Sequence, residues 1–196
     1  MSAHNRAACN GKLSRVRRVD ELADLVGWTG TASAELSWQD VAGSVRVQYP
    51  ATYRELLDVF PSGEFADGIR VISPVQDTGT LELFRTNAEN WYSYFTHARD
   101  IAPETFPHKF HPEFDGLILW AIDDDHCYFW DPSGGRDPDT WPIVFLENTG
   151  PSWGAYDGSA VDFLFDVITG NFQHEALYSD WEDAPKTFYP TRFMGH

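Results

Sequence analysis

The chain has 196 residues, of which 42% are hydrophobic and 22% charged, so it is long enough to bury one core and general disorder is excluded. Fourteen basic residues against 30 acidic ones give a net charge of −16. A field of that sign repels nucleic-acid phosphates and anionic membrane surfaces, and it attracts a basic partner. Acidity of this size also serves solubility alone, and the charge by itself does not separate the two explanations.

The charge is unevenly distributed along the chain. Residues 1–19 contain no acid and five basic residues, which are Arg6, Lys12, Arg15, Arg17 and Arg18. We therefore treat residues 1–18 as a basic N-terminal extension and a candidate for disorder. This segment lacks the apolar core of a secretory signal, and no apolar stretch reaches the ~18 residues of a membrane helix. Cys9 and Cys127 are too few for a disulfide framework, so we expect a cytoplasmic protein.

In chain order, the sequence predicts helices at 15–26, 38–44 and 50–60, a strand within 68–75, a helix at 81–101, a loop at 102–114, strands at 115–122, 126–131 and 141–147, and a helix within 157–170. Ser37 is a candidate N-cap, Thr86 and Glu89 have capping-box spacing, and Asp157 or Ser159 caps the last helix. Residues 173–196 lack strong periodicity and form a tail or a strap. Helices before and after a central group of strands indicate one α+β domain.

The stretch "DDDHC" at 123–127 is the first candidate for a metal or catalytic cluster. Successive strand residues face opposite sides, so Asp123, Asp124 and Asp125 cannot all reach one ion from a strand, and the spacing of a calcium loop is missing. His126 and Cys127 lack the second ligand pair of a closed zinc site. Aspartate favours turns, so we interpret the stretch as the bend of a hairpin and expect no metal or cofactor.

Other candidates are no stronger. His108 and His111 have a ligand spacing only within a helix, and the prolines around them argue against one. Nucleotide-binding, serine-hydrolase and zinc-protease motifs are absent, and nothing selects a pair of carboxylates among 30 acids. Four tryptophans in the second half suit either a core or a sugar platform, and we favour the core: Trp120, Trp130, Trp141 and Trp153.

Two stretches carry a resemblance to a known family. "YPATYRELLDVFPSGEFADGI" resembles the "LP-x-x-Y-x-x-L" helix and following segment of the SUKH superfamily, the fungal cell-wall-assembly regulator family with its bacterial relatives. The run from Trp120 to Phe172 resembles the C-terminal half of actinobacterial members, through Trp130, the "WPIV" at 141–144, Trp153 and the "YDGS" at 156–159. Tyr49 departs from the leucine that is usual before the proline. The resemblance covers residues 19–172.

The resemblance implies a mixed, mostly antiparallel central sheet flanked by helices, and a binding protein rather than an enzyme. Bacterial members commonly act as immunity proteins that neutralise polymorphic or contact-dependent toxins, many of them nucleases. Because nuclease toxins tend to be basic, the acidic charge agrees with this role. The candidate partner-binding residues are acids at loop tips: Asp123, Asp124, Asp125, Asp137, Asp139, Glu64 and Asp67.

Two alternatives stay open from the sequence. One is a generic interaction domain of an unrelated regulatory assembly. The other is a small hydrolase with an acid pair in a cleft lined by tryptophans. The partner, the binding surface and the oligomeric state are not encoded in any motif of the sequence.

Overall fold

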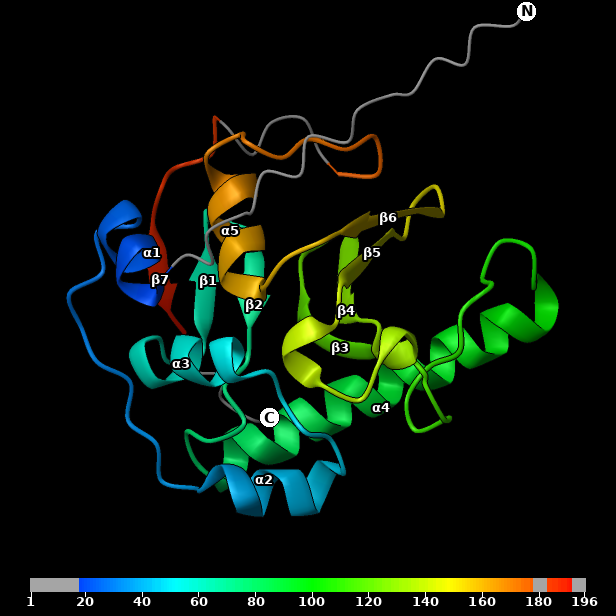
Figure 1. Ribbon diagram of the computed structural model, residues 1–196, viewed down its shortest axis with the longest axis horizontal. Helices are drawn as coiled ribbons and strands as arrows, with labels where there is room; N and C mark the ends of the chain where they lie inside the picture. The colour runs from blue at the N-terminus through cyan, green and yellow to red at the C-terminus, as the bar shows by residue number, and fades with distance from the viewer. Residues whose placement is uncertain (1–17, 178–182, 192–196) are drawn as a thin grey trace, which may run out of the picture.

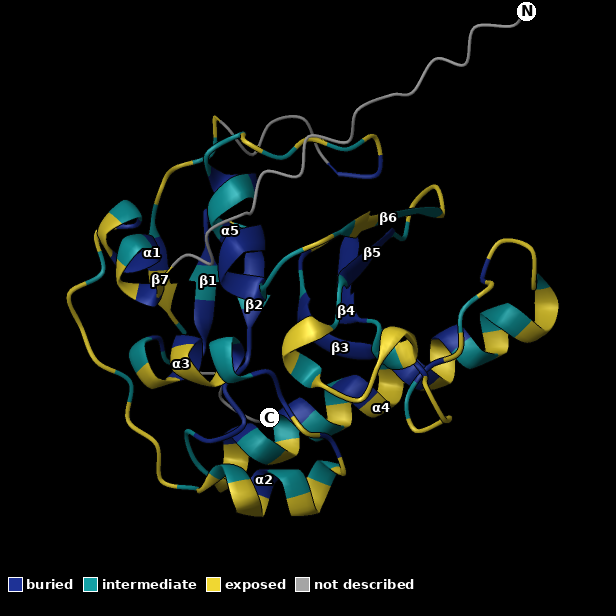
Figure 2. Cartoon of the chain, in the orientation of Figure 1, coloured by how far each residue is buried: buried dark blue, intermediate teal, exposed yellow. Residues whose placement is uncertain are grey.

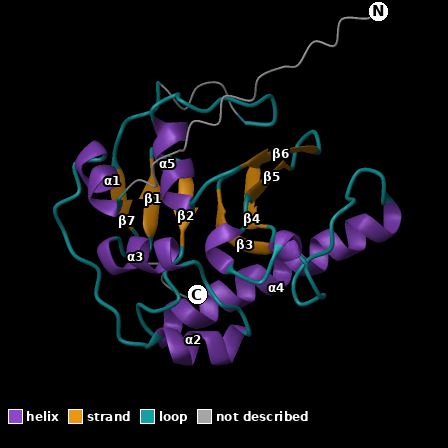
Figure 3. Cartoon of the chain, viewed as in Figure 1, coloured by secondary structure: helices purple, strands orange, loops and turns teal. Residues whose placement is uncertain are grey.

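The computed structural model describes residues 18–177 and 183–191. Its helices are α1 (Val19–Leu25), α2 (Trp38–Val45), α3 (Ala51–Val59), α4 (Thr78–Ile101) and α5 (Ala160–Ile168), with short 3-10 turns η1 (Pro132–Gly134) and η2 (Pro138–Thr140). Its strands are β1 (Gly63–Phe65), β2 (Ile69–Val71), β3 (Ile118–Ile122), β4 (His126–Trp130), β5 (Ile143–Glu147), β6 (Ser152–Tyr156) and β7 (Phe188–Pro190). The fold is α+β, as the order of elements in the sequence predicts (Figure 3).

The strands form one seven-stranded sheet in the order β6-β5-β4-β3-β2-β1-β7. Every pair of neighbouring strands is antiparallel, and the parallel pairing among the described residues is an isolated bridge between Phe110 and Leu117. Hairpins join β1 to β2, β3 to β4 and β5 to β6. The sheet is thus more uniformly antiparallel than the mixed sheet that the resemblance implies.

Helices cover the two faces of the sheet (Figure 1). Side chains alternate between the faces, so Trp120, Tyr128 and Trp130 belong to one buried cluster, with α1, α3 and α5, whereas Leu119 and Phe129 belong to a second cluster with α4. Figure 2 shows that strands β3, β4 and β5 are mostly buried, whereas helices α2 and α4 each have an exposed side. Aromatic rings dominate both clusters, and this accounts for the high aromatic content of the sequence.

Of the four tryptophans that suit either a core or a sugar platform, two are core residues. Trp120 and Trp130 are buried and stack with ring centroids 5.8 Å apart. Trp141 and Trp153 are half-buried and pack against the first and the second cluster, respectively. The preference for a core over a sugar platform is therefore confirmed for Trp120 and Trp130, whereas Trp141 and Trp153 lie at the margin of the two clusters.

Three local predictions need correction. The long helix begins at Thr78, because Asp77 and Thr80 form its capping box, so the capping box predicted at Thr86 and Glu89 is wrong. The sequence does not predict strand β1, because Gly-Glu-Phe has no β-branched residue and follows a Pro-Ser turn. The segment expected to be a tail or a strap supplies β7, which pairs with β1 and adds an edge strand to the sheet.

Other features follow the sequence. Ser37 and Ser159 each cap a helix, and Ser159 rather than Asp157 begins the last one. None of the described helices is both long and apolar enough to cross a bilayer. The basic residues Arg6, Lys12, Arg15 and Arg17 lie outside the described residues, so the structure does not test the N-terminal extension.

Candidate functional site

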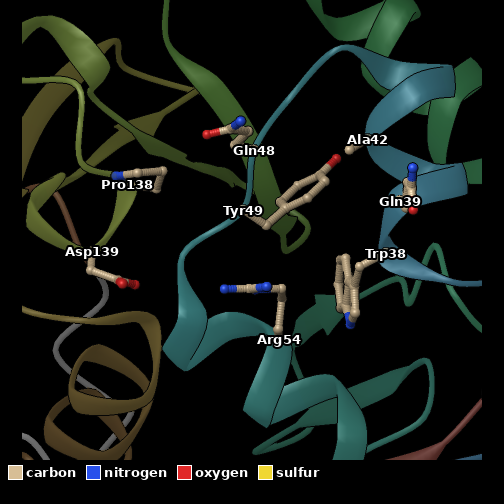
Figure 4. Close-up of a pocket in the computed structure, with 8 residues that line it drawn as sticks. All are labelled: Trp38, Gln39, Ala42, Gln48, Tyr49, Arg54, Pro138 and Asp139. Carbon is tan, nitrogen blue, oxygen red and sulfur yellow. The ribbon is translucent and has the colours of Figure 1, made fainter.

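A surface cavity of about 330 Å³ lies between α2, the start of α3 and the turn η2. Figure 4 shows the side chains that line it, which come from three separate segments of the chain. They combine two aromatic rings, two carboxamides, one guanidinium and one carboxylate: Trp38, Gln39, Ala42, Gln48, Tyr49, Arg54, Pro138 and Asp139. We name this the α2–α3 pocket.

Helix α2 supplies one wall of the pocket. The Ser37 side chain accepts a hydrogen bond from the Asp40 N–H, and the Asp40 carboxylate accepts one from the Ser37 N–H, which closes a capping box. The first turn therefore places Trp38 at a defined position. The helix ends at Arg46, whose left-handed φ of 57° turns the chain toward the sheet. Residues 47–50 then run back along the pocket.

Tyr49 forms the floor of the pocket. Its ring lies 5.5 Å from that of Trp38 and 5.9 Å from that of Trp130, so it joins the pocket to the main core. Burial raises the pKa of Tyr49 well above its ordinary value, so the phenol stays neutral at physiological pH. The floor is therefore an uncharged, rigid aromatic surface.

Asp139 connects the turn η2 to helix α3. Helix α3 begins after Pro50, which offers no side-chain cap, and Asp139 Oδ1 accepts a hydrogen bond of 2.5 Å from the Ala51 N–H. A carboxylate at a helix N-terminus satisfies an orphan donor and complements the helix dipole. Asp137 caps η2 in the same way, with its side chain bonded to the Asp139 N–H at 3.2 Å.

The Arg54 side chain lies between Asp139 and Trp38, and its guanidinium is directed toward the Asp139 side of the pocket (Figure 4). It is exposed, and its guanidinium makes no ion pair within the described part of the chain. The pocket thus presents a guanidinium and a carboxylate beside an aromatic floor. Such an arrangement can take a polar or charged side chain of another protein.

The structure places the seven predicted partner-binding acids in different parts of the fold, and five of them form two groups at opposite ends of the sheet. Asp67, Asp124 and Asp125 lie at the turns β1–β2 and β3–β4, which meet at one end of the sheet because Arg70 of β2 faces Ile122 of β3. Asp137 and Asp139 follow the opposite end of β4 and lie beside the α2–α3 pocket. Glu64 is in the middle of β1, half-buried.

The Asp123 side chain is buried, and its carboxylate accepts hydrogen bonds from other residues of the same hairpin. Its Oδ1 accepts hydrogen bonds from the N–H groups of Asp125 at 2.8 Å and His126 at 2.7 Å. His126 Nδ1 lies 2.9 Å from the same oxygen, and the Tyr128 hydroxyl donates to Oδ2 at 2.5 Å. Residues 123–125 are therefore the bend of a hairpin, as predicted, with His126 and Cys127 at the start of β4, and Asp123 presents little surface to a partner: its exposure is 7%.

Asp124 and Asp125 occupy the tip of the same hairpin. Asp124 is exposed and pairs with Arg70, with Nη2 and Oδ1 2.7 Å apart. The Asp125 carbonyl accepts a hydrogen bond of 2.7 Å from the Asn148 N–H, which joins this hairpin to the next one. The charge of Asp124 is thus partly neutralised, whereas Asp137 and Asp139 have no basic partner among the salt bridges of the described residues.

The other candidate clusters have structural contacts. His108 packs on Trp153 with ring centroids 4.6 Å apart, and His111 packs on Tyr92 at 5.6 Å. Burial lowers the pKa of both histidines. Within the parts of the chain that the structure describes, no group of three His, Cys, Asp or Glu side chains is arranged to hold a metal ion.

Sequence reasoning identified Asp139 but missed the pocket around it. Trp38 and Gln39 follow a recognisable N-cap, and Arg54 lies between the apolar positions of a predicted helix, so each was visible as a helix residue. What joins them is the contact between Asp139 and Ala51, which are 88 positions apart. No local pattern encodes such a contact.

Comparisons with family models, with curated proteins and with solved structures found no match to this chain. The resemblance to the SUKH superfamily thus stays a hypothesis that rests on the sequence motifs alone.

Proposed function

We propose that this protein is a non-enzymatic binding module for a basic protein partner, and that the partner is a bacterial toxin domain that it neutralises as an immunity protein. The resemblance of residues 19–172 to the SUKH superfamily suggests this role. The acidic surface is the observation in the structure that supports it.

The acidic charge is not neutralised inside the molecule. The described residues contain nine Lys and Arg, and four of these already pair with nearby acids: Arg18, Arg70, Arg85 and Arg99. The excess of acids must therefore be balanced by solvent ions or by a partner. Association with a basic protein would be fast at low ionic strength, because long-range attraction steers the encounter.

The end of the sheet that carries the α2–α3 pocket suits docking best. Asp137 and Asp139 are exposed there, beside a rigid aromatic floor that can take an anchoring side chain. The opposite end of the sheet carries Asp67, Asp124 and Asp125, but Asp124 already forms an ion pair with Arg70. A generic regulatory interaction domain would use the same surface, so the two roles differ in the partner and not in the docking chemistry.

The hydrolase alternative has less support. It requires an acid pair in a cleft lined by tryptophans, whereas Trp120 and Trp130 stack inside the core and the rings of Trp141 and Trp153 pack against it. Trp38 is the tryptophan that lines the α2–α3 pocket, where a single carboxylate, Asp139, already bonds the start of α3.

Co-expression tests the proposal. The test takes a toxin domain from a gene adjacent to that of this protein, induces it in cells with and without the protein, and follows growth and complex formation on size exclusion. We expect protection, and an association rate that falls steeply with salt because exposed charges are screened beyond about 8 Å at physiological ionic strength. Failure to protect, with no complex, would falsify the immunity role for that pair.

A further inference from the structure

Strand β6 forms an open edge of the sheet. It pairs along all five residues with β5, from Ser152 opposite Glu147 to Tyr156 opposite Ile143, and no other described strand pairs with its outer side. Figure 1 shows β6 at the margin of the sheet. An edge strand presents a row of backbone N–H and C=O groups that another extended chain can bond.

The side chains of β6 hold it firmly in place. Trp153 donates from Nε1 to the Thr105 carbonyl at 2.8 Å, and the Tyr156 hydroxyl donates to Asp166 Oδ2 at 2.6 Å. Gly154 lies so close to the Phe145 ring that a Cβ atom would be 2.2 Å from it. A strand that is already ordered loses little conformational entropy when a partner chain pairs with it.

Strand β6 also lacks the devices that protect natural sheet edges. Its sequence, SWGAY, contains no lysine, arginine or proline, and the register with β5 has no bulge. The other edge strand, β7, has three residues and ends in Pro190, which cannot donate to a ladder. The two edges of the sheet are therefore not equivalent, and β6 is the one suited to pairing.

The charges around β6 indicate what kind of strand it would accept. Glu147 lies opposite its first residue, Asp157 follows its last residue, and Asp166 bonds Tyr156. Lys109 is the basic residue in the loop that packs on Trp153. A second copy of this chain would bring its own net charge of −16 to the contact, which disfavours self-pairing.

We infer that β6 binds an extended, lysine- or arginine-rich segment of a protein partner by strand addition. The inference rests on the proposed function in taking a basic protein as the partner, and it adds the mode of recognition. Main-chain hydrogen bonds supply the pairing, and the acids at the two ends of β6 select a basic segment. The C-terminal end of β6 lies at the same end of the sheet as the turn η2, because Tyr156 faces Ile143.

The test uses peptide probes on the full-length protein, so it does not depend on any toxin. One probe is a peptide of about nine residues in which lysine alternates with valine or threonine, and the other has the same charge but alternates lysine with proline, which cannot form a ladder. We expect the first probe to bind, to protect amide hydrogens of residues 152–156 from exchange, and to bind at least about tenfold tighter than the second, the factor that one or two hydrogen bonds supply.

A pair of variants localises the binding. Ala155→Lys places a positive charge at an exposed position of β6, where edge lysines disfavour pairing with another strand. We expect this variant to bind the first probe about tenfold more weakly. Ala34→Lys makes the same change at an exposed position before α2 and should leave binding within about twofold. Equal binding of both probes, equal effects of both variants, or exchange protection elsewhere would overturn the inference. A dimer that Ala155→Lys dissociates would also overturn it, because the occupant would be a second copy.

The outcomes for the two proposals are distinguishable. Protection from the toxin that Ala155→Lys leaves unchanged would support the immunity role and refute strand addition. Binding of the alternating peptide at β6, together with failure to protect, would refute the immunity role and support strand addition.

Discussion

Asp139 Oδ1 accepts a hydrogen bond from the Ala51 N–H, so a residue in the loop between β4 and β5 caps a helix that precedes it by 88 positions. This contact joins α3 to the turn η2 and shapes the α2–α3 pocket. It also gives one of the predicted partner-binding acids a role in the fold, and the consequences can be measured.

Asp139→Ala should lower the free energy of unfolding by about 1 kcal/mol, because the start of α3 loses its acceptor and a favourable charge. Urea unfolding followed by far-UV circular dichroism measures the change. Glu55→Ala removes a carboxylate from an exposed position of the same helix and should cost less. Equal losses in the two variants would show that the contact contributes no stability.

Asp123→Asn should destabilise the protein much more, by about 3–5 kcal/mol, because it removes the carboxylate at the centre of a buried network with His126 and Tyr128. Asp124→Asn is the matched control in the adjacent position, where an exposed ion pair with Arg70 is worth under about 1 kcal/mol. Chemical denaturation of both variants gives the comparison. Similar stabilities would contradict the buried network.

The same carboxylate predicts a pH dependence. Burial disfavours the charged form of Asp123, but hydrogen bonds from His126 and Tyr128 together outweigh burial and hold the pKa of Asp123 below its usual value of 3.8. A group with a lowered folded-state pKa contributes stability that is present above the unfolded-state pKa and is lost as the pH falls through the folded-state pKa. The melting temperature of the wild type should therefore fall more steeply below pH 4 than that of Asp123→Asn. Parallel pH profiles would refute the assignment.

Trp130→Ala should cost about 3–5 kcal/mol, as truncation of a core aromatic residue does. Trp130 is 1% exposed, and its ring meets that of Tyr53 edge-on with centroids 4.7 Å apart. Phe114→Ala serves as the control, because Phe114 is 83% exposed and its removal should change stability by less than about 0.5 kcal/mol. A loss under about 1 kcal/mol for Trp130→Ala would place its ring outside the core.

The Cys127 thiol should be unreactive in the folded protein. Burial raises its pKa to about 12, so almost no thiolate is present at neutral pH. In a Cys9→Ser background, a thiol-specific chromogenic reagent should label Cys127 only when denaturant is added. Rapid labelling in native buffer would show that β4 opens readily or that the thiolate is accessible.

The sequence by itself determined the elements whose signals are local. Ser37 and Ser159 are N-caps that stand directly before the helices they begin, and three aspartates between two apolar runs indicate a turn, because aspartate bonds the backbone a few residues ahead. The apolar runs on either side of these aspartates also predicted two strands. The α+β class followed from the order of these elements, so no contact between distant residues was needed.

The tertiary structure alone decided what distant segments do together. It turned residues 188–190 into an edge strand through pairing with β1, and it placed Asp139 against Ala51. The Asp123 side chain is buried and that of Asp137 is exposed, although both are aspartates at turns, and only the packing of the whole chain decides this difference. The physical reason is that strand pairing, burial and the walls of the pocket depend on which distant segments pack together. Hydrophobic periodicity reports only the local conformation of the chain, so it does not predict contacts between distant residues.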